Sequence, residues 1–196
     1  KWDSVYAPRI AEFRSGKLVG KDLVRWKYQQ YMRDYLATLV SVDEGIGRLF
    51  DHLEKIGELD NTIIVYTSDQ GFFLGEHGWF DKRFMYEESF RTPLVVRYPA
   101  MSGGVVSDAL VQNLDFAPTY LDIAGIEVPD FMEGLSLKPL LENEGAKPRK
   151  WRKYLYYHFY DNSGGHNVSK HDGVSDGRYK LIHFYGPEGS YDELYD

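Results

Sequence analysis

A long stretch of helical periodicity, followed at once by a short strand, constrains the fold of this chain most strongly. Over residues 22–58 apolar side chains recur every three or four positions, which predicts one long helix, or two with a break near Gly45 and Gly47. Gly57 is a suitable helix stop. Residues 61–67 are β-branched and apolar on both faces, as in a buried parallel strand. A long helix before such a strand predicts an α/β layer.

The segments around this unit carry weaker patterns. Residues 1–20 lack periodicity and are expected to form a surface segment, and residues 68–92, rich in glycine, aromatic and charged side chains, a long functional loop. A second buried strand is predicted at 94–98. Residues 115–125 predict a helix in which Asp115 is the N-cap and a glycine closes the last turn.

The last part of the chain predicts a change of architecture. Residues 142–150 form a polar linker, and two strands follow at 154–160 and 178–185. We expect these two strands to pair antiparallel across the stretch 161–177, which is rich in glycine, serine and histidine.

Composition excludes several classes of protein. The chain has 196 residues, no cysteine, and 23 Lys and Arg against 30 Asp and Glu, a net charge of −7. Disulfides, thiolate metal sites and a cysteine nucleophile within this chain are therefore excluded. The acidic balance argues against a nucleic-acid partner, which favours a basic excess. No apolar run approaches the roughly 18 residues of a membrane span.

An acidic and an amide side chain stand directly after the first predicted strand. Asp69 and Gln70 lie where ligands bind in open α/β sheets, beyond the carboxyl end of a strand. Their oxygens suit a hard cation such as Ca²⁺ or Mg²⁺, although two ligands are too few for calcium, which takes about six to eight. The simpler interpretation is a turn in which the Asp69 side chain bonds to its own backbone.

Two further polar residues in the predicted loop have two interpretations each. Lys82 would hold an anionic group beside a metal, or it is an ordinary solvated lysine. His77, between glycine-rich neighbours, would donate a proton or bind an anion, or it has only a structural role.

The stretch TSDQGFFLGEHGWFDK, within a longer match over about residues 20–196, resembles the type I sulfatases of the alkaline phosphatase superfamily. It is most similar to bacterial sulfatases of glycosaminoglycans and other sulfated sugars. The resemblance implies an α/β fold. Residues 1–145 would be the C-terminal portion of an alkaline-phosphatase-like α/β sandwich, and residues 146–196 a small α+β subdomain with antiparallel strands.

The resemblance also implies roles for individual residues. Asp69 and Gln70 match metal ligands, and Lys82 matches the lysine that contacts the sulfate and the covalent intermediate. His77 falls in an element near the substrate, and His171 resembles a substrate-contacting histidine. Relatives often continue from that histidine with an arginine four positions on, whereas this chain has Ser175 there, so that contact is not carried over.

The family's nucleophile is absent from this sequence. It is a formylglycine made from Cys or Ser in a Cys/Ser-x-Pro-x-Arg motif, and these 196 residues contain no such motif. We therefore expect the chain, which begins at Lys1, to be a piece of a larger protein. Alone it would show no turnover, weak Ca²⁺ binding and poor solubility.

The resemblance implies a complete enzyme that uses Ca²⁺, with Mg²⁺ as the alternative, to remove sulfate from a sulfated saccharide in the periplasm or outside the cell. Two alternatives remain open at this point. The first is a phosphonate monoester or phosphodiester hydrolase of the same superfamily, and the second is a catalytically incomplete fragment. The sequence does not indicate an oligomeric state.

Overall fold

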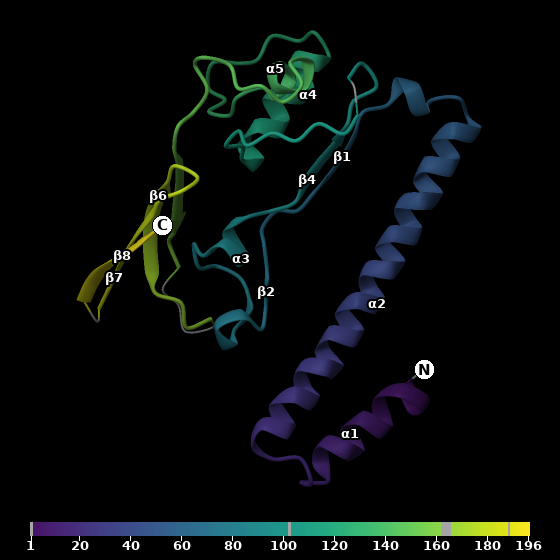
Figure 1. The fold of residues 1–196 in the computed structure, drawn as a ribbon, viewed down its shortest axis with the longest axis vertical. Coiled ribbons are helices and arrows are strands. Elements are labelled where there is room, and N and C mark those ends of the chain that lie inside the picture. The colour runs from purple at the N-terminus through teal and green to yellow at the C-terminus, as the bar shows by residue number, and fades with distance from the viewer. Residues whose placement is uncertain (1, 102, 162–165, 188) are drawn as a thin grey trace. The chain divides into compact units, whose positions relative to one another are not determined.

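The computed structural model describes residues 2–101, 103–161, 166–187 and 189–196 (Figure 1). Contacts divide the chain into two compact units, residues 1–59 and 60–196. Among the described residues, no helix is both long enough and apolar enough to cross a bilayer.

The first unit is entirely helical. A π-helix at Trp2–Tyr6 leads into α1 (Ala7–Arg14), and α2 (Gly20–Lys55) follows. The predicted long helix is confirmed and runs without a break. It ends just before Gly57, the helix stop that the sequence predicted. The φ of Gly57 is 75°, in the left-handed region that glycine tolerates.

The surface segment expected at residues 1–20 has no buried residue among those described, but the helix α1 within it was not predicted, and contacts with α2 support that helix. Arg9 forms an ion pair with Asp34 at 2.8 Å, and the indole of Trp26 donates a hydrogen bond to Glu12 at 2.9 Å. The ring of Phe13 stacks on that indole. Local periodicity does not report such tertiary contacts, so the sequence pattern missed the helix.

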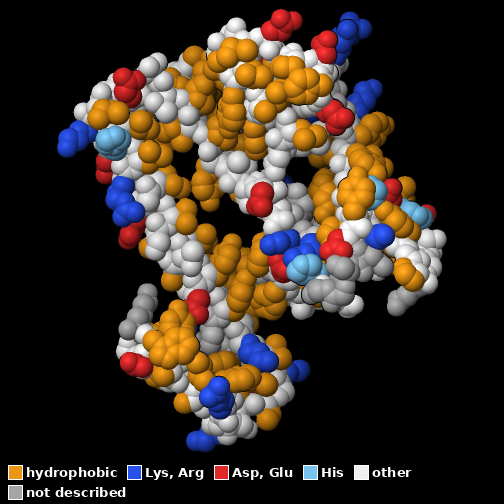
Figure 2. All heavy atoms as spheres, turned by 180° about the vertical axis from the view of Figure 1, so that it is seen from behind, with side chains coloured by type: hydrophobic (Ala, Val, Ile, Leu, Met, Phe, Trp, Pro, Cys, Tyr) orange, Lys and Arg blue, Asp and Glu red, His pale blue; other side chains and the backbone are white. Residues whose placement is uncertain are grey.

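The first unit lacks a buried core. None of the described residues of α1 or α2 is buried, and Val24, Leu36 and Val40 are more than half exposed, at 67%, 53% and 59%. Figure 2 shows many hydrophobic side chains at the surface of the molecule. The contacts between α1 and α2 therefore hold this unit together.

The second unit begins with a pair of strands, β1 (Ile64–Thr67) and β4 (Leu94–Arg97). Both were predicted, but the expectation of a buried parallel strand was wrong: β1 and β4 pair antiparallel, with Ile64 opposite Arg97. Neither strand contains a fully buried residue. Apolar side chains on both faces predict contacts on both faces, and they do not specify the direction of the neighbouring strand.

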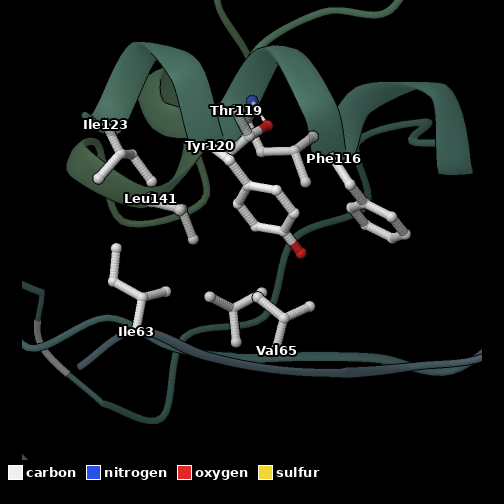
Figure 3. A pocket seen from close by; sticks show the side chains of 9 residues that line it. Ile63, Val65, Phe116, Thr119, Tyr120, Ile123 and Leu141 are labelled. Atoms are coloured by element: carbon white, nitrogen blue, oxygen red, sulfur yellow. Dashed lines mark hydrogen bonds between the residues drawn. The ribbon is translucent and has the colours of Figure 1, made fainter. Parts of the chain in front are cut away.

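Two helices, α4 (Phe116–Ile123) and α5 (Lys138–Glu142), pack on this strand pair. Figure 3 shows Tyr120 and Ile123 of α4 and Leu141 of α5 directed toward Ile63 and Val65. The apolar cavity between them has about 10 Å³ of volume, so it belongs to the packing of a core and offers no room for a ligand.

The segment 68–92 is mostly loop, as predicted, but short elements subdivide it. A miniature hairpin pairs β2 (Phe73–Leu74) with β3 (Phe80–Asp81) around a 3-10 turn, and α3 (Glu87–Phe90) follows.

The C-terminal part is a four-stranded antiparallel sheet in the order β5-β6-β7-β8. Its strands are β5 (Leu155–Phe159), β6 (Lys170–Ser175), β7 (Lys180–Gly186) and β8 (Gly189–Tyr195). The two predicted strands are confirmed. Their predicted pairing was wrong, because β6 lies between them and pairs with both. Part of the stretch 161–177, residues 162–165, lies outside the described residues.

One face of this sheet carries the main hydrophobic core. Met85, Ile182 and Phe184 are buried, and four partly buried aromatic residues pack around them: Phe84, Tyr86, Phe90 and Tyr157. Two of the buried residues come from β7 and the third from the segment before α3. The loop 82–90 therefore rests directly on the C-terminal sheet.

Asp115 stands at the N-cap position of α4, as predicted, but its side chain makes no capping hydrogen bond to that helix. It is fully buried, and its carboxylate accepts hydrogen bonds from the backbone N–H groups of Gln112 (2.9 Å) and Leu135 (2.8 Å). It also forms a two-pronged ion pair with Arg152. Arg152 lies beyond the domain boundary expected after residue 145. That boundary lies inside the second unit and remains a prediction.

Candidate active site

The loop after β1 presents Asp69 and Gln70. The Ser68 hydroxyl donates to the Gln70 carbonyl at 2.8 Å, and the side-chain amide of Asn113 donates to the Asp69 carbonyl at 2.8 Å. The Asp69 side chain is exposed and that of Gln70 is half-buried. The predicted bond of the Asp69 side chain to its own backbone is not found among the hydrogen bonds of the described residues; the Ser68 hydroxyl closes the turn and lies 3.3 Å from Asp69 Oδ1. The exposed Asp69 side chain is therefore accessible to a ligand.

Gly71 fixes the end of this loop against α3. Its N–H donates to the carbonyl of Ser89 at 2.8 Å, and a Cβ at this position would lie 2.2 Å from the carbonyl oxygen of Glu88. That separation is far below any van der Waals contact. Only glycine therefore allows the two backbones to approach so closely.

Lys82 lies on a second loop, between two residues with unusual backbone geometry. Asp81 has φ of 84° and Arg83 has φ of 100°, backbone angles that residues other than glycine rarely adopt. The Lys82 ammonium lies 3.2 Å from the Asp81 carboxylate, which Arg83 also contacts. Burial raises the pKa of Asp81, but the hydrogen bonds and charges of Arg83 and Lys82 outweigh it and hold this pKa below its usual value.

Backbone hydrogen bonds hold the strained Arg83 in place. Its N–H donates to the Ser89 hydroxyl at 2.8 Å, and its carbonyl accepts from the Tyr157 hydroxyl at 2.7 Å. Ser89 is itself buried. Its carbonyl therefore anchors the loop of Asp69 and Gln70, while its hydroxyl anchors the loop of Lys82. One residue ties the two loops to the same short helix.

His77 lies at the tip of the miniature hairpin with φ of 57°. Its Nε2 lies 3.2 Å from the Glu88 carboxylate, and its ring contacts the rings of Phe73, Trp79 and Tyr86. The side chain is 55% exposed. His77 is therefore accessible to a ligand and has the Glu88 carboxylate beside it.

His171 differs from His77 in that it is fully buried within the sheet. Its Nδ1 donates to the Ser169 carbonyl at 2.8 Å, and Nε2 has no hydrogen-bond partner among the described residues. The rings of Phe84, Tyr157 and Phe184 lie against it. Burial lowers its pKa below the usual value, which favours the neutral ring. Its predicted contact with substrate remains a prediction.

The sequence did not identify the anchors of the site. Ser89, Asn113 and Tyr157 act through backbone carbonyls and N–H groups of other segments, and no local pattern marks such contacts. The signal that does exist is Gly71 directly after the acid–amide pair, which indicates a close approach of two backbones.

The donor set at this site suits a hard divalent cation. Asp69 and Gln70 offer a carboxylate and an amide oxygen on one anchored loop, the donors that Ca²⁺ and Mg²⁺ prefer. Among the described residues, no group of three or more His, Cys, Asp or Glu side chains is arranged to hold a metal. The chain thus supplies two candidate ligands.

Comparison with known families gives two overlapping matches. The family "Sulfatase" matches residues 5–126, and the family "N-sulphoglucosamine sulphohydrolase, C-terminal" matches residues 75–196. The N-acetylglucosamine-6-O-sulfatase of Bacteroides thetaiotaomicron is 64% identical over the whole chain, and the N-acetylglucosamine-6-sulfatase of Homo sapiens is 44% identical over 59% of it. These alignments cover 35% and 21% of the two relatives, so the chain spans about a third of the length of the first.

Solved structures agree with this result. A structure described as being in complex with its substrate, D-glucosamine-2-N,6-O-disulfate, matches all of this chain and 40% of its own with a TM-score of 0.95 and 64% identity. A phosphonate monoester hydrolase from Silicibacter pomeroyi matches 79% of this chain and 32% of its own with a TM-score of 0.69 and 32% identity. The predicted α/β fold of the alkaline phosphatase type is thereby confirmed. The chain belongs to the sulfatase family.

Proposed function

We propose that this chain forms part of a sulfatase that hydrolyses the 6-O-sulfate ester of a glucosamine unit in a sulfated saccharide. Asp69 and Gln70 would hold the metal, and Lys82 would bind the sulfate. The observation that carries the proposal is the double anchor at Ser89, whose carbonyl holds the Gly71 N–H and whose hydroxyl holds the Arg83 N–H, both at 2.8 Å. This double anchor holds the backbones of the two neighbouring loops, one with the oxygen donors Asp69 and Gln70 and the other with the Lys82 ammonium group.

Lys82 would bind an oxygen of the sulfate group and stabilise the negative charge that grows on it during transfer. Asp81 pairs with the Lys82 ammonium at 3.2 Å, and the strained backbone around Lys82 limits the positions that the side chain can reach. Such preorganisation favours the transition state because little reorganisation remains to be done. His77, next to Glu88, would carry the proton that the leaving sugar oxygen requires.

The proposed metal is Ca²⁺, with Mg²⁺ as the alternative. When bound, it would neutralise sulfate oxygens and so assist attack by a formylglycine nucleophile, for which this chain has no precursor motif. Asp69 and Gln70 fit this role because their loop is anchored and the Asp69 side chain is exposed.

The substrate is proposed from the relatives and from the chemistry of the site. The 64% identical relative is named as an N-acetylglucosamine-6-O-sulfatase, and the matching structure is described with a 6-O-sulfated glucosamine. Sulfated saccharides are anions that do not cross membranes freely, so we also propose the periplasm or the exterior of the cell as the place of action.

A phosphonate monoester hydrolase is the second candidate, because a structure of that activity matches 79% of the chain at 32% identity. The candidates share the anchored loops and differ in the group transferred. A third outcome, a chain without any activity of its own, is our expectation for these 196 residues when purified alone.

A chimera separates these candidates. This chain would replace the matching 197 residues of the Bacteroides thetaiotaomicron relative, and the product would be assayed with N-acetylglucosamine-6-sulfate, an aryl sulfate and an aryl phosphonate monoester. We expect the sulfated sugar to give the highest kcat/KM. A preference for the phosphonate would reject the sulfatase proposal in favour of the second candidate.

Controls within the chimera test the residue roles. Asp69→Ala should abolish Ca²⁺-dependent turnover, whereas Asp130→Ala, at an exposed carboxylate of the same unit, should leave it unchanged. Repeating the turnover measurement with Mg²⁺ in place of Ca²⁺ distinguishes the two cations. Full activity of Asp69→Ala would contradict its assignment as a metal ligand.

A further inference from the structure

An unusually basic segment joins α5 to the C-terminal sheet. Five of the seven residues from Lys147 to Lys153, KPRKWRK, carry a positive charge, in a chain whose net charge is −7. Short runs of this kind are typical of surfaces that bind polyanions. The proposed chemistry of the sulfate site does not use this segment, so its charge requires a separate explanation.

Two residues of the basic segment, Trp151 and Arg152, hold it in a defined conformation. The indole of Trp151 donates to the carbonyl of Leu110 at 2.9 Å, and Arg152 pairs with the buried Asp115. The N–H of Trp151 also closes a turn on the carbonyl of Pro148 at 3.0 Å. This anchoring lowers the entropy cost of binding a ligand to the charged residues on either side.

Three cations of the segment remain exposed. Arg149, Lys150 and Lys153 take part in none of the ion pairs found among the described residues. Lys147 lies 3.2 Å from Asp108, a carboxylate with 87% of its side chain exposed, and such a surface pair contributes little and yields readily to a competing anion.

A cleft lies beside the segment. It has a volume of about 530 Å³, and its lining includes Lys147, Arg152, Lys153 and, from the turn between β6 and β7, Arg178. Clefts of about 300–1,000 Å³ accommodate small ligands. The carboxylate of Asp176, also at this cleft, accepts hydrogen bonds from the N–H groups of Arg178 and Tyr179. A second carboxylate, Asp108, also lines the cleft, and Arg178 pairs with Asp196 at 2.7 Å, so Lys153 is the lining cation without an ion pair among the described residues.

We propose that the segment 147–153 and this cleft bind a sulfated polysaccharide chain. The choice of polymer rests on the proposed function, since a sulfatase of sugars meets its substrate as part of such chains. The charge also favours it over nucleic acid, because a local cationic patch on an acidic chain suits a few sulfate groups rather than a long, uniformly charged backbone. The planar guanidinium of Arg149 would pair with a sulfate through two hydrogen bonds.

The test measures binding of the chimera to a fluorescent heparin oligosaccharide at low salt. The triple variant R149Q, K150Q and K153Q is compared with a matched variant, K17Q, K21Q and R25Q, which removes the same charge from exposed positions of the first unit. We expect the first variant to lose about tenfold or more in affinity and to show a shallower dependence on salt. The matched variant should change by less than about twofold. Circular dichroism checks that both are folded, and the single variant K153Q gives an intermediate loss.

Three outcomes would overturn the proposal. Equal losses in the two triple variants would show that only net charge matters. Binding of a single-stranded oligonucleotide as tight as that of heparin, or of desulfated heparin as tight as that of heparin, would show that sulfate is not recognised. The assay involves no turnover, so an inactive chimera with intact heparin binding would reject the proposed function and leave this surface standing.

Discussion

One candidate site histidine lies in the loop 68–92 and the other in the C-terminal sheet, and their surroundings are opposite. His77 in the loop is 55% exposed and has Glu88 beside it. His171 in the sheet has no exposed surface and is surrounded by aromatic rings. The loop thus presents polar groups to a ligand, whereas the sheet encloses one within a core. The difference teaches that the residue type alone does not assign a role, because burial decides what a histidine can contact.

The largest effect is expected at Lys82, which tests whether the loop carries the chemistry. In the chimera, Lys82→Ala should lower kcat by about 10³-fold, as loss of a group that stabilises transition-state charge does. The melting temperature should hardly change, because the contact found for this side chain is a partly exposed ion pair with Asp81, and such pairs contribute little to stability. Lys55→Ala, at an exposed lysine without an ion pair among the described residues, is the control. Retained activity in Lys82→Ala would refute the assignment.

Gly71 tests the close approach of the first loop to α3. In Gly71→Ala the new Cβ would meet the carbonyl of Glu88 at 2.2 Å, so the loop of Asp69 and Gln70 must move. We expect at least about a tenfold loss in apparent Ca²⁺ affinity and in kcat, because small displacements at a site are costly. Gly47→Ala, with open space around it, is the matched control. Equal behaviour of the two variants would show that the approach does not matter.

Ser89 tests the anchor of the second loop. Ser89→Ala keeps the carbonyl that holds Gly71 and removes the hydroxyl that accepts from Arg83. Leaving that N–H unsatisfied costs about 1–3 kcal/mol of stability in chemical denaturation. We expect kcat to fall by about tenfold while Ca²⁺ affinity stays within twofold. A parallel loss of metal affinity would mean that the two loops are not anchored separately.

His171 tests the other half of the comparison, and its effect is the smallest. Burial lowers its pKa below the usual value near 6.5, so the unfolded chain binds a proton more readily than the folded one. Stability from this residue is therefore complete above about pH 6.5 and is lost as the pH falls through the range below it. Denaturation of wild type and His171→Phe at pH 7.5 and 5.5 should show a steeper loss in wild type.

The same variant examines the predicted contact of His171 with substrate. If His171 only packs, His171→Phe in the chimera keeps its KM for the sulfated sugar. A rise in KM of about tenfold at unchanged stability would instead support the predicted contact.

Much of the fold could be predicted because its signals are local. The spacing of apolar residues identified α2, and Gly57 identified its end, where φ is 75°. Strand β6 was missed because its sequence, KHDGVS, has charged, glycine and serine residues that are typical of loops. It forms a strand because it pairs with β5 on one side and β7 on the other. Strand β8, GSYDELY, was missed for the same reason.

The site was predictable as chemistry but not as architecture. The types of Asp69, Gln70 and Lys82, together with the family resemblance, indicate metal and sulfate binding from the sequence alone. Ser89 could not be found in this way, because it acts through a carbonyl and a hydroxyl on residues that lie 18 and 6 positions away in the chain. Contacts of that kind depend on the folded backbone.

The most direct measurement is a crystal structure of the chimera with Ca²⁺ and a sulfated sugar bound. We expect side-chain oxygens of Asp69 and Gln70 at about 2.3–2.6 Å from the ion. We also expect the amine of Lys82 at about 2.7–3.2 Å from a sulfate oxygen. An ion held without those two oxygens, or an amine that does not reach the sulfate, would contradict the central claim.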